Sequence, residues 1–129
     1  MPEMRIQHVA LSVSDIGKSG PWYSDLFGFQ KVAEFADPPM EIYMTPDGQA
    51  LDLRQDPDVA PGMFDEKRVG LDHLAFVCLS AAEMDEWKTK MAELGIANSG
   101  MIESPFGKHI NFRDPDGIAL EFYLPGTAA

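Results

Sequence analysis

The chain has 129 residues, 45% of them hydrophobic, which is the usual size and composition of one domain with its own core. Its 10 lysines and arginines stand against 21 aspartates and glutamates, and the formal charge of −11 argues against a polyanionic partner such as nucleic acid. The single cysteine excludes an intrachain disulfide, and neither a signal-peptide pattern nor an apolar run of ~20 residues is present. We therefore expect a cytoplasmic protein that does not enter a membrane.

The first half of the chain is predicted to form a strand, a helix and three further strands. Alternation over residues 6–13 predicts a strand with aliphatic side chains on one face and His8 on the other. The helix is expected to begin near Pro21, because Gly17 and Gly20 interrupt the turns before it. A Pro-Asp-Gly turn precedes the last of three strands predicted at residues 31–36, 40–45 and 49–54.

The second half repeats this order after a connector at residues 55–70, which is rich in Pro, Gly and Asp. A strand is predicted over residues 73–78. The following helix should begin at Ser80, which forms a capping box with Glu83, and end at Gly95. Its apolar stripe consists of Met84, Trp87, Met91 and Leu94. The last three strands are predicted at residues 99–103, 108–113 and 118–124.

The two halves also match each other residue by residue, which indicates an internal duplication. Residues 8–13 match residues 73–78, residues 26–29 match residues 93–96, and residues 46–53 match residues 115–122. The matches occur in the same order, and their offset changes only as small loop insertions would change it. Each half of about 60 residues is marginally stable alone, so the halves should pack together or against a second chain.

Four polar side chains fall at equivalent strand positions in the two repeats: His8, Asp52, His73 and Glu121. Strand parity places each of them opposite the aliphatic face of its strand. Two imidazoles and two carboxylates suit Zn, Ni, Co, Fe(II) or Mn. A lone strand histidine is more often a surface residue than a ligand, but equivalent pairs in both repeats predict a site for one divalent metal ion.

From His8-Val-Ala-Leu to Phe112-Arg-Asp-Pro-Asp-Gly-Ile-Ala-Leu-Glu-Phe-Tyr, the chain resembles the vicinal oxygen chelate (VOC) superfamily. This family includes glyoxalase I, type I extradiol dioxygenases, methylmalonyl-CoA epimerase, and the fosfomycin and bleomycin resistance proteins. The resemblance implies a glyoxalase-like α+β fold, in which two tandem βαβββ modules form an open, curled mixed sheet with helices on its outer face. It also implies a homodimer and a single domain over residues 1–129, with repeats at about 5–54 and 71–124.

The resemblance further assigns roles to these residues. The His-Glu-His-Glu pattern of bacterial glyoxalase I falls on His8, Asp52, His73 and Glu121, and Asp52 is shorter by one methylene. Without Asp52, the others form the two-histidine, one-carboxylate set of iron(II) oxygenases and of manganese-dependent fosfomycin-inactivating transferases. The implied activity is that of a lyase or isomerase, in which a metal chelates vicinal oxygens of a small substrate and Glu121, with Asp52, transfers a proton. A thiol cosubstrate is compatible with this activity.

Two other functions remain open at this point. One is an extradiol dioxygenase with His109 as the base near the metal. The other is a metal-free protein of the bleomycin-resistance type that sequesters a drug, and the net acidity suits a cationic drug. The four retained ligands disfavour this second alternative. Glutathione recognition is also disfavoured, because that tripeptide is anionic and the chain has few arginines to hold carboxylates.

The remaining conspicuous side chains have structural as well as functional interpretations. Arg54 and Tyr123 follow a ligand by two residues, so they line either a substrate pocket or solvated strand ends. His109 is a third pocket candidate, although an exposed strand residue is the favoured interpretation. Residues 104–107 are expected to form an ordinary turn. Core positions are expected for Trp22, Trp87 and Cys78, the last as an inert thiol.

Overall fold

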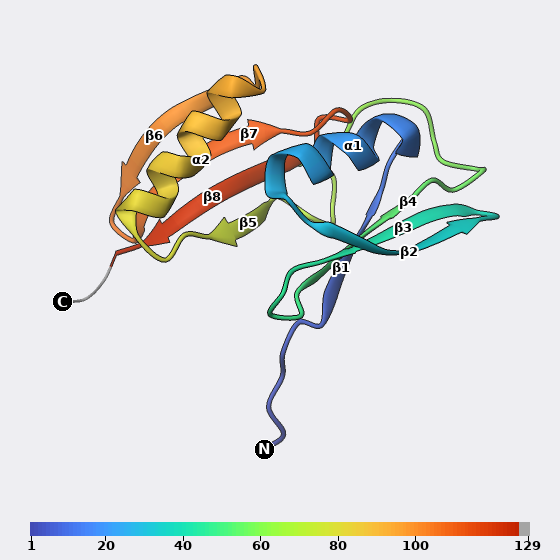
Figure 1. The fold of residues 1–129 in the computed structure, drawn as a ribbon, viewed down its shortest axis with the longest axis horizontal. Coiled ribbons are helices and arrows are strands. Elements are labelled where there is room, and N and C mark those ends of the chain that lie inside the picture. Colours follow the sequence, from blue (N-terminus) through green and yellow to red (C-terminus); the bar gives the residue numbers. More distant parts are fainter. Residues whose placement is uncertain (127–129) are drawn as a thin grey trace. The chain divides into compact units, whose positions relative to one another are not determined.

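The computed structural model describes residues 1–126, which fall into two compact units, one of Met1–Gly62 and one beginning at Met63. The first unit contains β1 (His8–Ser12), α1 (Ile16–Phe27), β2 (Gln30–Ala36), β3 (Pro39–Met44) and β4 (Ala50–Arg54). The second contains β5 (Leu74–Val77), α2 (Ala81–Glu93), β6 (Asn98–Ser104), β7 (Gly107–Arg113) and β8 (Ala119–Pro125) (Figure 1). Both units have the predicted order βαβββ.

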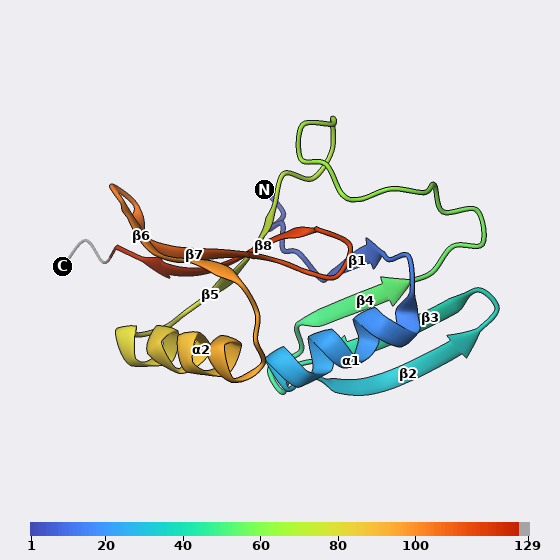
Figure 2. The same cartoon turned by 90° about the horizontal axis from the view of Figure 1, so that it is seen from above.

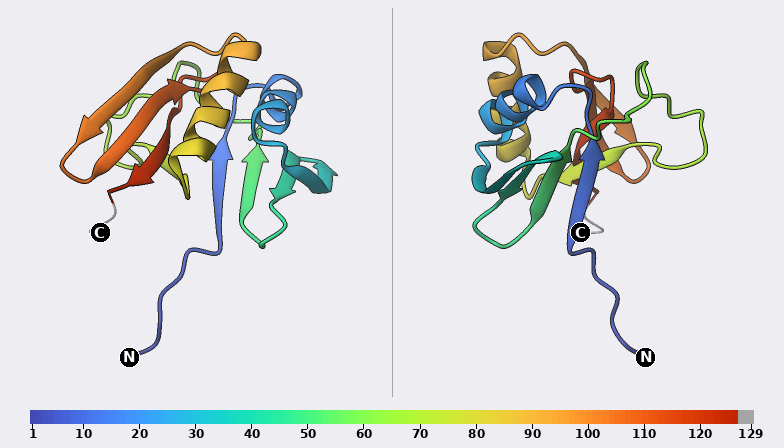
Figure 3. Two further views of the ribbon diagram at one scale, coloured as in Figure 1. Left: turned by 60° about the vertical axis from the view of Figure 1, so that its left-hand side comes forward. Right: turned by 90° about the vertical axis from the view of Figure 1, so that its right-hand side faces the viewer.

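Each unit has its own four-stranded mixed sheet, with the strand order β1-β4-β3-β2 in the first and β5-β8-β7-β6 in the second. In both sheets the first strand pairs in parallel with the last, and the other pairs are antiparallel. Figure 3 shows β1 and β4 side by side and pointing the same way. The identical order confirms the predicted glyoxalase-like α+β fold and its internal repetition.

The two faces of each sheet differ in the way that strand parity predicts. On β4, Leu51 and Leu53 are buried, whereas Asp52 lies on the other face. On β8, Leu120 and Phe122 are buried on the side opposite Glu121. Helix α1 packs against β3 and β4, and α2 packs against β8 (Figure 2). The helices therefore cover the aliphatic faces, and the predicted ligands lie on the faces away from the helices.

The predicted start of the first helix was wrong, because α1 begins at Ile16 and contains Pro21. Side-chain acceptors satisfy its first backbone donors: Gln55 Oε1 accepts from Ile16 N at 2.8 Å, and Asp15 Oδ1 accepts from Gly17 N at 3.0 Å. Gln55 is 39 residues distant in the sequence, so local helix signals do not reveal its contribution.

Gly20 is a packing residue of α1 and does not interrupt the helix. A Cβ at this position would overlap Glu41 Oε1 and lie 3.0 Å from the Tyr43 hydroxyl oxygen. The Tyr43 hydroxyl donates a hydrogen bond to Glu41 Oε1 at 2.6 Å beneath the helix. Burial and this neighbouring carboxylate raise the pKa of Tyr43 well above its usual range. The missing side chain of Gly20 therefore leaves room for a polar pair between helix and sheet.

The second helix follows its sequence signals closely. Ser80 Oγ accepts from Glu83 N at 3.1 Å, and Glu83 Oε2 accepts from Leu79 N at 3.0 Å, so the capping box extends one residue further out than usual. Gly95 has a φ of +69° and ends the helix as predicted. Of the predicted apolar stripe, Met84 and Met91 are fully buried and Trp87 is half-buried, whereas Leu94 at the end of the helix is 43% exposed.

Aromatic rings form the centre of the second unit. Phe122 is fully buried between Trp87 and Phe112, with ring centroids 4.6 Å and 4.9 Å away and interplanar angles of 13° and 22°. In the first unit, Trp22 is half-buried and its ring contacts buried Tyr23 edge to face at 4.8 Å. Both tryptophans thus contribute to packing, as the sequence predicted.

Cys78 is 1% exposed, in agreement with its predicted core position. Burial, with a smaller effect of Glu83, raises the pKa of Cys78 from the ordinary 9.0 to about 11. Because the thiolate is the reactive form, the thiolate fraction at pH 8 falls by about a hundredfold. We expect native protein to react with a disulfide reagent at least ~100-fold more slowly than a free thiol does, with one fast equivalent after denaturation. A fast equivalent in native protein would contradict the core position.

The Pro-Asp-Gly turns precede the last strand of both repeats, and Gly48 and Gly117 have positive φ angles of 89° and 79°. In the second repeat, buried Asp114 organises the turn, because its Oδ1 accepts from Asp116 N and from Ile118 N, both at 2.8 Å. We expect Asp114→Ala to lower the free energy of unfolding by ~2–4 kcal/mol, since it leaves two buried donors without their acceptor. Urea denaturation would measure this, with exposed Asp47→Ala in the first turn as the milder comparison.

The second part of the connector is tied to the β7–β8 turn. Phe64 N donates to Asp116 O at 2.9 Å, and the Arg113 guanidinium binds both carboxylate oxygens of Glu66 at 2.8 and 3.0 Å. This guanidinium is the main cause that lowers the pKa of Glu66 to about 2. The predicted turn at residues 104–107 links β6 to β7. Among the described residues, no helix has the length and apolar character needed to cross a membrane.

Candidate metal centre

Each unit brings one histidine and one carboxylate together on the sheet face away from its helix. His8 Nε2 lies 3.8 Å from Asp52 Oδ2, and His73 Nε2 lies 3.5 Å from Glu121 Oε2. The two carboxylates are largely buried, with side chains 14% and 12% exposed, while the histidines are about half exposed at 49% and 46%. Both pairs arise because the first strand of each repeat runs parallel and adjacent to the last.

The residue that precedes each histidine anchors the other ring nitrogen. His8 Nδ1 is hydrogen-bonded to Gln7 Oε1, and His73 Nδ1 donates to Asp72 Oδ1 at 2.7 Å. Because both oxygens act as acceptors, the neutral imidazoles carry their proton on Nδ1 and leave the Nε2 lone pair facing the carboxylate. Metal-binding histidines are usually held in this way. Sequence reasoning missed Gln7 and Asp72, although both precede a repeat-equivalent histidine.

The donor atoms fit a divalent cation. Neither His–carboxylate distance is short enough for a good hydrogen bond. Two atoms that each lie about 2.1 Å from a tetrahedral metal are about 3.4 Å apart, close to the observed separations. Asp52 Oδ1 is buried without a hydrogen-bond partner among the described residues, an arrangement that is costly unless a further group binds it. The longer distance in the first unit belongs to aspartate, the shorter of the two carboxylate side chains.

The predicted four ligands appear as two pairs, one in each unit. Within residues 1–126, the structure brings together no group of three or more His, Cys, Asp or Glu side chains that would hold a metal ion by itself. Each pair alone offers two ligands, whereas protein sites for these metals usually supply three or four. The prediction that both pairs bind one ion therefore stays a prediction.

The three predicted pocket residues lie on the same sheet faces as the His–carboxylate pairs. Arg54 is two residues beyond Asp52 on β4, and its side chain is half exposed and lies 3.6 Å from Asp56. Tyr123 pairs with His109 across β8 and β7, and the two rings are 6.3 Å apart with nearly parallel planes. Since Asn111 pairs with Glu121 in the same ladder, His109 also lies on the Glu121 face. The structure thus defines the parity of His109, which the sequence left open.

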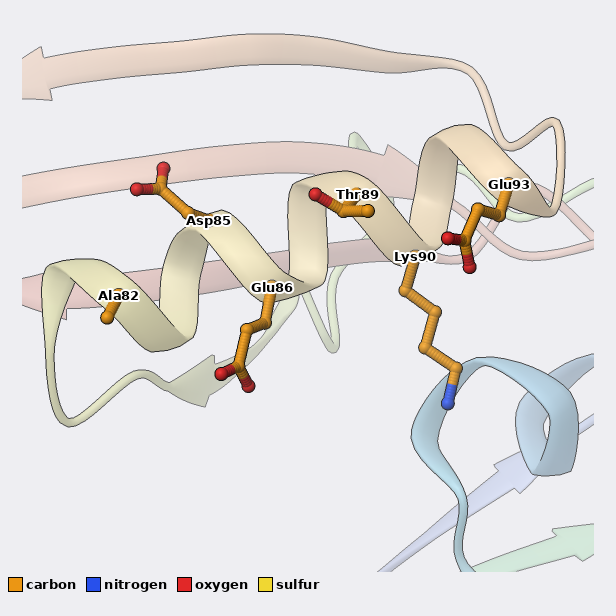
Figure 4. A pocket seen from close by; sticks show the side chains of 6 residues that line it. All are labelled: Ala82, Asp85, Glu86, Thr89, Lys90 and Glu93. Carbon is orange, nitrogen blue, oxygen red and sulfur yellow. The ribbon is translucent and has the colours of Figure 1, made fainter.

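A shallow depression on α2 is separate from these positions. It lies along one helix and is lined by Ala82, Asp85, Glu86, Thr89, Lys90 and Glu93, as Figure 4 shows. None of these residues belongs to the predicted site. Four of the six side chains are charged, and all of them project from a single helix, as expected for an ordinary solvated helix face.

A family model described as the Glyoxalase/Bleomycin resistance protein/Dioxygenase superfamily matches residues 5–122. The chain belongs to this superfamily. The match covers both repeats and confirms the resemblance found in the sequence. Membership in the superfamily places the chain among proteins with several different reactions, so the reaction itself requires a separate argument.

The chain is also similar to individual proteins of this superfamily. The chain is 31% identical over 128 residues to metallothiol transferase FosB from Shouchella clausii, covering 96% of this chain and 82% of that protein. A glyoxylase/bleomycin resistance protein/dioxygenase domain from Frankia sp. EAN1pec is 31% identical, with a TM-score of 0.89 over 99% of this chain and 96% of that one. Lactoylglutathione lyase from Agrobacterium tumefaciens is 25% identical, with a TM-score of 0.77 over 96% of both chains.

Proposed function

We propose that this protein is a divalent-metal-dependent enzyme of the glyoxalase-like type that acts on a small substrate with two neighbouring oxygen atoms. The proposed ligands are His8, Asp52, His73 and Glu121, and the metal is Zn, Ni, Co, Mn or Fe(II). The protein would act as a homodimer. In this homodimer, both types of His–carboxylate pair would contribute ligands to one metal ion. The reaction class is that of a lyase or isomerase that moves a proton between carbon atoms.

One observation carries this proposal: a His–carboxylate pair occurs at equivalent positions in both repeats, at or directly before the start of the first strand, and the preceding residue anchors Nδ1 of each histidine. Ordinary solvent-exposed polar side chains would not be expected to direct imidazole Nε2 atoms toward largely buried carboxylates in both repeats. The unpartnered Asp52 Oδ1 adds support, because a cation would satisfy it.

The metal, when bound, would supply a Lewis acid that polarises the substrate oxygens and so acidifies the neighbouring carbon. Glu121 would act as the base at Oε2, accepting a proton from this carbon and returning it to the adjacent one. Asp52 would assist from the first repeat. Gln7 and Asp72 would hold the histidine rings in the tautomer that exposes Nε2. Arg54, Tyr123 and His109 would line the substrate pocket.

A second candidate is the metal-dependent transfer of a thiol. The curated relative that is 31% identical is named a metallothiol transferase, and a thiol cosubstrate is compatible with the same ligand set. In this reaction the protein would position an electrophilic substrate for attack by the thiol. Glu121 would not have to remove a proton from a carbon atom. The two candidates therefore differ in what they demand of Glu121.

Elemental analysis tests the metal proposal. Protein purified without chelator and reconstituted with zinc, nickel, manganese or iron(II) should hold one ion for each predicted set of four ligands. The double variant His8→Ala/Glu121→Ala should lose it. A matched control is His109→Ala/Glu103→Ala, which removes the same side-chain types away from the proposed ligands and should retain the metal. Absence of stoichiometric metal in the parent under all four conditions would refute the proposal.

Activity assays then separate the reaction classes. Thiol-dependent loss of a 2-oxoaldehyde is expected for a glyoxalase-type enzyme, and transfer of a thiol to an electrophilic substrate is expected for a transferase. Oxygen uptake with a catechol would instead support the extradiol dioxygenase. Tight binding of a cationic drug by metal-free protein would favour the sequestering function. Analytical ultracentrifugation of the same samples tests the proposed homodimer.

A further inference from the structure

A strip of side chains crosses the sheet of the second unit next to Glu121. Its four members pair in register across all four strands, on the face that carries Glu121: Val77, Tyr123, His109 and Ile102. Val77 is 58% exposed and Ile102 is 38% exposed, while the nearly parallel rings of Tyr123 and His109 lie between them. We call these four residues the aromatic strip. It lies two residues along β8 from the proposed base.

The equivalent row in the first unit contains Ser12, Arg54, Met40 and Phe35. Phe35 is 52% exposed, and Met40 is half-buried. The neighbouring row places Ile42 beside Asp52. The strands β2 and β3 therefore offer mainly apolar side chains to the face that carries Asp52, and the arginine of this row belongs to β4.

Within residues 1–126, the strands carry one arginine on each of these two sheet faces, and each arginine lies within 4 Å of a carboxylate. On the Asp52 face, the strands carry only Arg54, which lies 3.6 Å from Asp56. On the Glu121 face, they carry only Arg113, which binds Glu66 with two hydrogen bonds and also donates to Gly117 O at 3.0 Å. Lys31 belongs to the opposite, helix-covered side, since it pairs with Tyr43, and is held by Glu34 and Glu41.

The few cations on these two faces limit which charge a bound substrate can carry. A carboxylate or phosphonate that leaves water needs cationic or hydrogen-bonding partners, and Arg is the usual partner for both groups. Here Arg113 is bound by Glu66 through two hydrogen bonds, and Arg54 forms a half-exposed ion pair with Asp56. The chain also carries a net charge of −11 that repels anions. An apolar group gains from contact with the aromatic strip, and it requires no counter-charge.

We propose that the substrate of the metal centre is uncharged, with an apolar, ring-sized body that contacts the aromatic strip while its two oxygens reach the metal. This inference rests on the proposed function and specifies its substrate class. An uncharged substrate distinguishes this protein from enzymes that bind their substrate through carboxylate or phosphonate groups of that substrate. Tyr123, at the centre of the strip, determines the preference for an uncharged substrate. The equivalent position of the first repeat is Arg54.

The test uses catechols that share one chelating pair of oxygens and differ in the group opposite it. Isothermal titration calorimetry would measure the binding of 4-tert-butylcatechol, 3,4-dihydroxybenzoate and 3,4-dihydroxybenzylamine to the zinc-loaded protein. Each affinity is corrected for the affinity of the same probe for free zinc. The neutral probe should bind at least tenfold more tightly than either charged probe. Equal or tighter binding of a charged probe, or binding of none, would overturn the proposal.

Variants of Tyr123 show whether the aromatic strip causes the preference. Tyr123→Ala should weaken the neutral probe at least tenfold, and Tyr123→Phe should restore its affinity. Tyr123→Arg should tighten the carboxylate probe at least tenfold. Phe106→Ala, which removes a 78% exposed ring from the β6–β7 turn, is the matched control and should change nothing. Should Tyr123→Ala alter the sedimentation mass and leave probe affinity unchanged, the strip would be a contact between copies and the proposal would fail.

Failure of this inference is distinguishable from failure of the proposed function. Zinc-loaded protein that prefers the carboxylate probe would refute only the substrate class. Protein that takes up no zinc, nickel, manganese or iron(II) would refute the metal centre, and the substrate assignment with it.

Discussion

Glu121→Gln is expected to lower kcat/KM by about 10²–10⁴-fold in the assay that detects proton transfer, which is the usual contribution of a general base. Glutamine keeps the length and one oxygen of the side chain but cannot accept the proton. Glu121 is largely buried and lies 3.5 Å from His73 Nε2, so bulk water has little access to the position of its carboxylate. Steady-state kinetics with parallel metal analysis would measure the effect.

The matched control for this variant is Glu103→Gln on β6. The Glu103 side chain is 76% exposed and lies 3.6 Å from Lys108, so its replacement should leave kcat/KM within about twofold of the parent. A Glu121→Gln protein that retains metal and full activity would contradict the base assignment. Full thiol transfer with loss of proton transfer would instead favour the transferase candidate.

Phe122→Ala is expected to lower the free energy of unfolding by about 3–5 kcal/mol, the usual cost of truncating a buried phenylalanine. Phe122 is fully buried and stacks on both Trp87 of α2 and Phe112 of β7, so its removal leaves a cavity between helix and sheet. Phe122 and Glu121 are neighbours on β8, so their side chains lie on opposite faces of the sheet. Urea denaturation followed by circular dichroism would measure the loss.

Phe106→Ala provides the same chemical change at a 78% exposed position and should cost less than about 1 kcal/mol. A similar loss for both variants would mean that Phe122 is not part of a close-packed core. In the Phe122→Ala protein, the fluorescence of Trp87 should change in the native state as well, because the stacked ring of Phe122 is gone.

Most of the fold was predictable because periodic patterns are local. Alternation over two residues defined which faces of β4 and β8 carry Asp52 and Glu121, and the structure places both on the faces away from the helices. The capping box at Ser80 predicted the start of α2 within one residue, because its partners are close in sequence. The start of α1 was mispredicted because the local N-cap Asp15 was overlooked and because Gln55, which accepts from the first amide, lies 39 residues away, just after β4.

The sequence by itself determined the duplication, the family and the identity of the four candidate ligands, because these depend on residue type, register and parity. Only the tertiary structure showed that Gln7 and Asp72 anchor the histidines, that Arg113 is occupied by Glu66 and that His109 shares the Glu121 face. The last two facts depend on contacts between distant segments and on strand pairing, which neither local propensity nor composition encodes. Gln7 and Asp72 are sequence neighbours of their histidines, and only the side-chain geometry shows their hydrogen bonds. The ion pairs of the two guanidiniums and the aromatic strip therefore support the proposal of an uncharged substrate, a property that the sequence had left open.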